Sequence, residues 1–272
     1  MQEIIQKKYH RLKSILAELP MAAVAFSGGV DSSLLLHTCL ETLGTERVMA
    51  LTARSPLMPK KELQEACDLA QSMGVTRHVI VDTPDLNGFA FKNNPRDRCY
   101  FCKKEILSSF LKLLEEEQGC CLRGGPRLME GTNGDDPKAY RPGRQAVLEL
   151  GVSSPLLQAN LGKKEIRHLS HTLGLPNWDL PSQACLASRI PYGDALELNK
   201  LLQVEKGEGV IKKLGFRECR LRHHGSLARL EVPSRDLNEL LSLKTEITEK
   251  LKALGFTYVT LDLEALRSGS FD

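Results

Sequence analysis

The sequence predicts an α/β protein, in which a parallel sheet flanked by helices is followed by a smaller α+β domain. Three observations indicate this architecture. Short apolar strands alternate with amphipathic helices over the first two-thirds of the chain, polar loops follow three of those strands, and the element order changes after residue 190. Strand–helix alternation implies right-handed crossovers and a parallel sheet with helices on both faces.

The alternating part contains four expected strands, at 21–27, 47–53, 76–83 and 127–136, the last running into a polar loop. The expected helices lie at 31–44, 59–74, 102–119 and 163–176. Gly44 and Gly74 close the first two helices, as glycine commonly does. Ligands of such sheets collect at the carboxyl ends of the strands. The loops at 26–33, 51–55 and 130–136 all lie there, so we expect them to form one site.

The last third has a different pattern. A helix is expected at 195–216, a hairpin at 218–233, a helix at 237–256 and a final strand at 258–263. We therefore predict a larger α/β domain over 1–190 and a small α+β domain, for substrate binding or oligomerisation, over 191–272.

Composition excludes several classes of function. The chain has 272 residues, a net charge of +3 and no basic tract, so charge does not favour a nucleic-acid partner. No apolar run reaches the roughly 18 residues that cross a bilayer, and the N-terminus resembles no targeting signal. We expect a cytoplasmic protein without a membrane partner, whose eight cysteines are reduced thiols.

The loop "AFSGGVDSS", residues 25–33, joins the first expected strand to the first expected helix. Glycines that expose successive N–H groups before a helix N-terminus form an anion site. The loop has neither the GxGxxG spacing of dinucleotide folds nor the lysine of a Walker loop. The alternative is a plain turn in which Asp31 caps the helix.

SGGxDSS is the signature of the PP-loop ATP pyrophosphatases, and this loop resembles it closely. The resemblance implies that ATP is split to AMP and pyrophosphate, that the loop binds the pyrophosphate portion, and that Asp31 helps to hold Mg²⁺. It also implies adenylation of a substrate, followed by attack of a nitrogen or sulfur nucleophile. The expected ATP-binding residues here are Ser27, Gly28, Gly29, Val30, Asp31, Ser32 and Ser33.

Three cysteines need a separate explanation: Cys99 and Cys102 in "RCYFCK", and Cys185 in "SQACLASR". A C-x-x-C pair serves redox, zinc or iron–sulfur chemistry. A second C-x-x-C pair would favour structural zinc, and the sequence has none. Three thiols can hold a [4Fe–4S] cluster and leave one iron open for a substrate or an extra sulfide. In the alternative, Cys185 is a lone catalytic or buried thiol and the pair merely packs.

Longer motifs narrow the family. "NPRDRCYFCK", "EGTNGDD", "YRPGRQAVLELGVSSPL", "QACLASRIPYG" and "RLRHHGSLARLEV" together resemble the LarE family of ATP-dependent sulfur transferases over nearly the whole chain. Such enzymes thiolate pyridinium-3,5-biscarboxylic acid mononucleotide, whose bis-thiocarboxylate product binds nickel as the cofactor of lactate racemase. In one version of the family the cysteine of "ACLxSRIPYG" gives up its own sulfur. In the other it joins a C-x-x-C pair around a [4Fe–4S] cluster that carries the sulfide.

Because all three thiols are present, the sequence resembles the cluster version, with Cys99, Cys102 and Cys185 as its ligands. LarE relatives form higher oligomers, so we expect a homo-oligomer acting on a small nucleotide. The sulfur donor that reloads the cluster stays open. The expected catalytic residues are Cys185, Asp31 and Arg189.

Other polar residues complete the predicted site. At the strand ends, the ATP is expected to meet Thr52, Gly131, Thr132, Asn133 and Asp135. The substrate is expected to meet Arg141, Ser188, Arg189, Arg220, Arg222 and Glu231. Arg141 and Arg144 suit a phosphate or an ion pair with Asp135 or Asp136. Family resemblance implies a phosphate contact for Arg220 and Arg222 and a metal contact for Glu231, against the alternative of a solvated strand face. His223, His224 and Trp178 receive no role.

Three other functions compete. A tRNA thiolase would need an RNA-binding surface, which the charge does not favour. An ammonia-using synthetase would leave the three cysteines idle. A nucleotide-binding regulator without turnover would not need Asp31 together with the thiols.

Overall fold

The computed structural model describes residues 2–83, 92–118, 125–136, 142–181 and 184–266. The chain divides into two compact units, which are described separately. Unit 1 comprises Met1–Pro84 and Asp97–Gln183, and unit 2 comprises Asp85–Arg96 and Ala184–Asp272.

The centre of unit 1 is a parallel sheet of β1 (Ala22–Ala25), β2 (Val48–Arg54), β3 (Arg77–Asp82) and β4 (Arg127–Met129). The strand order is β3-β2-β1-β4, and every pairing is parallel. β1 and β2, the inner strands, are almost wholly buried, as expected for a sheet covered on both faces. The predicted fold class, a parallel sheet flanked by helices, is confirmed.

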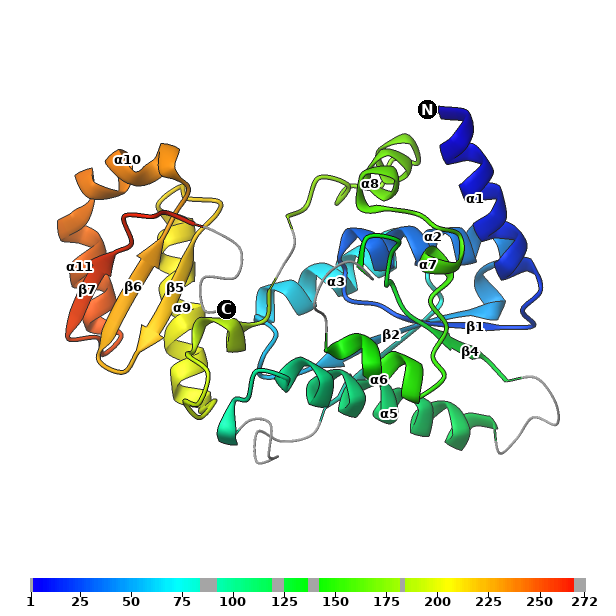
Figure 1. Cartoon of the computed structure of the whole chain (residues 1–272), viewed down its shortest axis with the longest axis horizontal. Helices are drawn as coiled ribbons and strands as arrows, with labels where there is room; N and C mark the ends of the chain where they lie inside the picture. Colours follow the sequence, from blue (N-terminus) through cyan, green and yellow to red (C-terminus); the bar gives the residue numbers. More distant parts are fainter. Residues whose placement is uncertain (1, 84–91, 119–124, 137–141, 182–183, 267–272) are drawn as a thin grey trace. The chain divides into compact units, whose positions relative to one another are not determined.

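Helices cover both faces of this sheet (Figure 1). Ala22 and Val24 of β1 face a core shared with the first group of helices, whereas Ala23 faces the core of the second group. This alternation follows from the two-residue period of a strand. The first group is α1 (Gln2–Ala17), α2 (Val30–Leu43), α3 (Lys60–Ser72), α7 (Pro155–Gln158) and α8 (Lys163–Thr172). The second group is α5 (Arg98–Gln118) and α6 (Gly143–Glu149).

Unit 2 contains a three-stranded sheet in the order β5-β6-β7. β5 (Arg220–His224) and β6 (Leu227–Glu231) form the predicted hairpin, and β7 (Tyr258–Leu261) pairs with β6 in parallel. The helices are α9 (Leu198–Lys213), α10 (Leu237–Ser242) and α11 (Lys244–Ala253). Its short 3₁₀ turns are η3 (Leu186–Arg189) and η4 (Ser234–Asp236), and a further one, η1 (Thr45–Arg47), lies in unit 1.

Two details differ from the sequence prediction. The helix expected at 237–256 is two helices, because the backbone at Leu243, with φ −96° and ψ 13°, departs from the helical conformation between α10 and α11. α6 and α7 occupy a segment to which no element was assigned, since each is too short to show a helical period.

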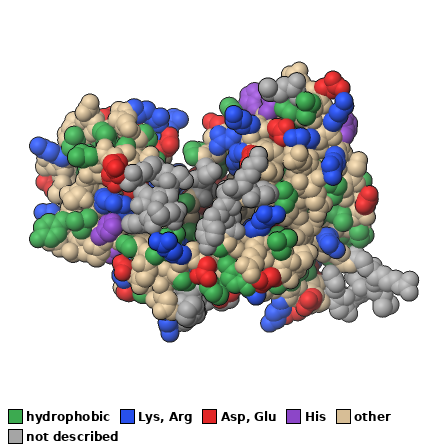
Figure 2. Space-filling view, in the orientation of Figure 1, with side chains coloured by type: hydrophobic (Ala, Val, Ile, Leu, Met, Phe, Trp, Pro, Cys, Tyr) green, Lys and Arg blue, Asp and Glu red, His purple; other side chains and the backbone are tan. Residues whose placement is uncertain are grey.

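Two surface properties bear on function. Among the described residues, no helix combines the length and apolarity that crossing a bilayer requires. On the face drawn in Figure 2, lysine and arginine side chains are interspersed with acidic ones and do not gather into a tract.

Candidate active site

The loop between β1 and α2 is shaped by two glycines. Gly28 has φ +74°, a conformation that side chains disfavour, and a Cβ on it would lie 3.0 Å from the Cβ of Ala66 in α3. Gly29 is the N-cap of α2, and its carbonyl accepts hydrogen bonds from the Ser32 hydroxyl and the Ser33 amide, both at 3.0 Å. The loop is therefore a tight backbone turn that ends at a helix N-terminus, where amide groups favour an anion.

The loop after β4 lies against the first turn of α2, as the topology predicts. A Cβ on Gly131 would be 3.1 Å from the amide nitrogen of Ser32. The loop is held by its own side chains. The Asn133 side-chain oxygen accepts from the Asp135 amide, and the Asn133 amide donates to Asp136, both at 2.9 Å. Asn133 thus shapes this loop, and the Thr132 amide is held by Glu130 at 3.0 Å.

Lys163 connects the two loops, and sequence reasoning missed it. Its Nζ lies 2.6 Å from an oxygen of Asp31, and its amide donates to Asp135 at 2.7 Å. Lys163 is the first residue of α8, and Glu165 accepts from the Gly162 amide at 2.9 Å, as a capping glutamate does. The sequence Gly-Lys-Lys-Glu at 162–165 could have indicated Lys163, because a capping glutamate three residues after a glycine marks a helix start whose first residue is this lysine.

Thr52, a predicted ATP contact, is fully buried at the end of β2. Its hydroxyl donates to the Phe26 carbonyl at 2.8 Å, so the His78 Nε2, also at 2.8 Å, must donate to the hydroxyl. Burial lowers the pKa of His78, in agreement with a neutral ring. The Thr52 side chain therefore links the segment after β1 to β2 and β3 near the carboxyl ends of these strands.

Cys99 and Cys102 lie at the start of α5, three residues apart and so on one face of the helix. Cys99 is exposed and Cys102 is half-buried. Neighbouring side chains fix this turn: Tyr100 and Lys104 both bind Glu149 of α6, at 2.7 and 2.9 Å. The turn that presents the two thiols is therefore tied to α6 by these side-chain bonds.

Lys103, beside Cys102, forms a 2.6 Å ion pair with Glu130, which is buried. The other Glu130 oxygen accepts from the Thr132 amide and from the Ser154 hydroxyl at 2.6 Å. Burial alone would raise the pKa of Glu130, but Lys103 and these hydrogen bonds together lower it. Glu130 thus ties the thiol-bearing turn of α5 to the loop after β4.

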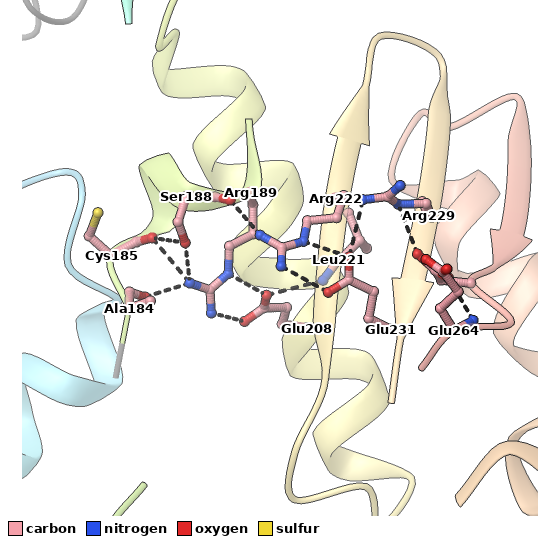
Figure 3. Close-up of polar contacts among 11 residues, drawn as sticks. Ala184, Cys185, Ser188, Arg189, Glu208, Leu221, Arg222, Arg229, Glu231 and Glu264 are labelled. Atoms are coloured by element: carbon pink, nitrogen blue, oxygen red, sulfur yellow. Dashed lines mark hydrogen bonds and ion pairs between the residues drawn. The ribbon is translucent and has the colours of Figure 1, made fainter. Parts of the chain in front are cut away.

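In unit 2, Cys185 is exposed and immediately precedes η3 (Figure 3). The Arg189 guanidinium is buried and donates to the carbonyls of Ala184 and Cys185 and to the Ser188 hydroxyl. Glu208 of α9 receives two further bonds from Arg189, at 2.8 and 3.2 Å. Ser188 and Arg189 therefore shape the turn that presents the Cys185 thiol.

Glu231 is fully buried between two arginines. Arg222 binds both of its oxygens, at 2.9 and 2.8 Å, and Arg229 binds one at 3.1 Å. Arg222 also donates to the Ser188 carbonyl at 2.6 Å, which links β5 to the Cys185 turn. Burial, together with Arg189 and Arg222, lowers the pKa of Arg220, which lies on the same strand face. The hairpin thus places Arg220 in a mixed cluster with two arginines and the carboxylates of Glu208 and Glu231, which oppose the lowering.

Several expected residues are not brought into one described site. Arg141 lies outside the described residues. Among the residues that the structure describes, no three His, Cys, Asp or Glu side chains group as metal ligands. Cys99 and Cys102 belong to unit 1, and Cys185 belongs to unit 2. Trp178 packs edge-on against His171 in unit 1, with ring centroids 4.6 Å apart.

Comparison with known proteins agrees with this geometry. Residues 4–97 match the NAD synthase family model. An NH₃-dependent NAD⁺ synthetase of Methanococcoides burtonii is 27% identical over 57% of each chain. An uncharacterized protein of Synechocystis is 37% identical over 99% of this chain and 98% of its own. The pyridinium-3,5-bisthiocarboxylic acid mononucleotide synthase of Lactiplantibacillus plantarum is 36% identical over 95% of this chain and 91% of its own. This similarity to the synthase covers almost the whole chain, and the chain also has the SGGVDSS loop and the exposed cysteine of "ACLASR". The chain therefore belongs to the LarE family of PP-loop enzymes.

Proposed function

We propose that this protein transfers sulfur to pyridinium-3,5-biscarboxylic acid mononucleotide at the expense of ATP. The observation that carries the proposal is the loop at 27–33, which builds an anion site at the N-terminus of α2 in a chain similar over almost its whole length to the synthase named above.

The first step activates a carboxylate. An oxygen of the substrate carboxylate attacks the α-phosphorus of ATP, the bond to the pyrophosphate oxygen breaks, and an acyl adenylate remains. The loop amides and the Lys163 ammonium would stabilise the charge on the departing pyrophosphate. The Asp31 carboxylate is the hard oxygen ligand that Mg²⁺ prefers, and Mg²⁺ would add further positive charge there.

The second step replaces AMP. A sulfur nucleophile attacks the acyl carbon, the bond from that carbon to the AMP oxygen breaks, and a thiocarboxylate forms. We propose Cys99, Cys102 and Cys185 as the residues that hold the sulfur. Thiolates are the usual ligands of iron–sulfur clusters, and two thiols three residues apart on one helix face, one exposed and one half-buried, suit such a centre. When bound, a [4Fe–4S] cluster with three cysteine ligands supplies an open iron for an exchangeable sulfide.

The exposed Cys185 thiol also suits the sacrificial route. In that route Cys185 Sγ forms a thioester with the acyl carbon as AMP leaves, and the Cβ–Sγ bond then breaks with loss of the Cα proton, which leaves dehydroalanine and the thiocarboxylate. The hydrogen bonds of Arg189 to the Cys185 carbonyl and to Glu208 would orient the thiol in either route. Arg220 is the arginine that we propose to contact the substrate phosphate, because guanidinium groups bind phosphate oxygens in a bidentate manner.

The direct test is turnover with the pyridinium nucleotide. Purified protein with Mg²⁺ and ATP should release AMP and pyrophosphate, and mass spectrometry should show one substrate oxygen replaced by sulfur. A tRNA thiolase would instead modify tRNA in the same assay, and an ammonia-using synthetase would require an ammonium salt.

The sulfur source is tested by anaerobic purification. The cluster route predicts about four irons per chain, the content of a [4Fe–4S] cluster, and loss of iron and turnover in Cys99→Ala and Cys102→Ala. A colourless protein in which Cys185 loses a sulfur atom after one turnover would support the sacrificial route instead.

A further inference from the structure

Asn177 lies in the loop after α8 and reaches back to the nucleotide loop. Its side-chain nitrogen lies 2.7 Å from the carbonyl oxygen of Gly28 and 2.9 Å from the hydroxyl of Ser33. A carbonyl oxygen only accepts, so the group at 2.7 Å must be the amide nitrogen of Asn177. The orientation of the side-chain amide is therefore set by its partner.

The contact with the Gly28 carbonyl fixes a peptide plane. In a trans peptide the C=O and the following N–H point in opposite directions. When the Gly28 carbonyl points to Asn177, the Gly29 N–H must point to the other side of the loop. On that side of the loop the Gly29 N–H donates a long, 3.4 Å hydrogen bond to the hydroxyl of Ser27, which is itself a residue of the nucleotide loop.

Because glycine stands on both sides of this peptide, its orientation is set by its hydrogen-bond partners and not by side-chain sterics. Gly28 and Gly29 lack the Cβ atoms that would restrict rotation, and Gly28 already has φ +74°. A flipped peptide would present a carbonyl oxygen where an anion is to bind. The second bond, to Ser33 in the first turn of α2, anchors Asn177 to the helix that follows the loop.

We infer that Asn177 is a positioning residue for pyrophosphate: it holds the Gly28–Gly29 peptide so that the Gly29 amide faces the β- and γ-phosphates of ATP. This inference rests on the proposed function, because it takes the loop to bind ATP. It adds a residue that lies far from the SGGVDSS motif in the sequence.

The test compares ligands with and without the pyrophosphate group. Isothermal titration of the full chain would measure Mg²⁺–ATP, inorganic pyrophosphate and AMP against the wild type, Asn177→Ala and Asn177→Asp. Loss of an amide bond to a charged phosphate predicts roughly tenfold or weaker binding of ATP and pyrophosphate in Asn177→Ala. AMP should bind within about twofold of the wild type, since free rotation of one peptide does not alter the nucleoside contacts.

Asn177→Asp should be weaker still, because its carboxylate would face the Gly28 carbonyl oxygen at 2.7 Å and repel pyrophosphate. Trp178→Leu is the matched control. It removes the ring contact with His171 from the same loop, without a change in charge, and should leave ATP binding unchanged. Circular dichroism would establish that each variant is folded.

The outcomes separate the two levels of the inference. Wild-type protein that binds neither ATP nor pyrophosphate would overturn the proposed function, and with it the role of Asn177. A wild type that binds ATP, with Asn177→Ala equally tight or with ATP and AMP weakened alike, would overturn the role of Asn177 alone.

Discussion

Replacement of Gly28 by alanine tests the loop geometry quantitatively. The substitution adds a Cβ at φ +74°, which costs about 1–2 kcal/mol for an L-residue. The same atom would meet Ala66 at 3.0 Å from its Cβ and 3.2 Å from its Cα, and overpacking of this kind costs about 1–3 kcal/mol. We therefore expect Gly28→Ala to lower the free energy of unfolding by about 2–5 kcal/mol.

Gly74→Ala is the matched control, because Gly74 has the same φ of +74° but nothing within 4 Å of an added Cβ. It should cost only the conformational part, about 1–2 kcal/mol, and leave ATP binding intact.

The assay is urea unfolding followed by tryptophan fluorescence. Trp178, the one tryptophan of the chain, lies in unit 1 with the loop and reports that unit. Titration with ATP would then measure the effect on binding. The reasoning is refuted if Gly28→Ala is no less stable than Gly74→Ala and binds ATP as the wild type does.

Three further substitutions test the ion pairs. Lys163→Met removes the cation beside Asp31 and should raise the KM for ATP roughly tenfold or more. An unchanged KM would show that the ion pair has no part in ATP binding. Glu231→Gln leaves buried Arg222 without its counter-ion and should cost about 3–5 kcal/mol in urea unfolding followed by circular dichroism; a cost under about 1 kcal/mol would contradict a buried pair. Because the pKa of Glu130 is lowered from 4.5 in the folded state, its ionised form stabilises the fold above that value and the stabilisation is lost as pH falls. The wild type should therefore lose more stability than Glu130→Gln below about pH 4.5, and parallel pH curves for the two proteins would argue against this role.

Short-range patterns predicted much of the fold. The nucleotide loop, the strands around it and the β5–β6 hairpin follow from glycine placement, strand–helix alternation and two-residue periodicity, all of which act within a few residues. The hairpin register, which pairs Arg222 with Arg229 and Arg220 with Glu231, also places Arg222 and Glu231 on one face. The charged cluster of unit 2 was therefore partly predictable.

Long-range contacts were not predictable in this way. Lys163 meets Asp31, and Asn177 meets Gly28, only because α8 and the loop after it return to the amino end of α2. No local pattern encodes that return. Arg189 shows the opposite difficulty: its place beside Cys185 in the sequence suggests a substrate contact, yet in the structure the side chain binds the backbone of its own turn and Glu208.

The central claim, sulfur transfer driven by ATP, is tested most directly by mass spectrometry of the pyridinium nucleotide after incubation with the protein, Mg²⁺ and ATP. The account predicts a thiocarboxylate product, formed with AMP and pyrophosphate and absent with Asp31→Asn or without ATP. An unchanged nucleotide, with AMP and pyrophosphate released only when ammonia or tRNA is supplied, would contradict it.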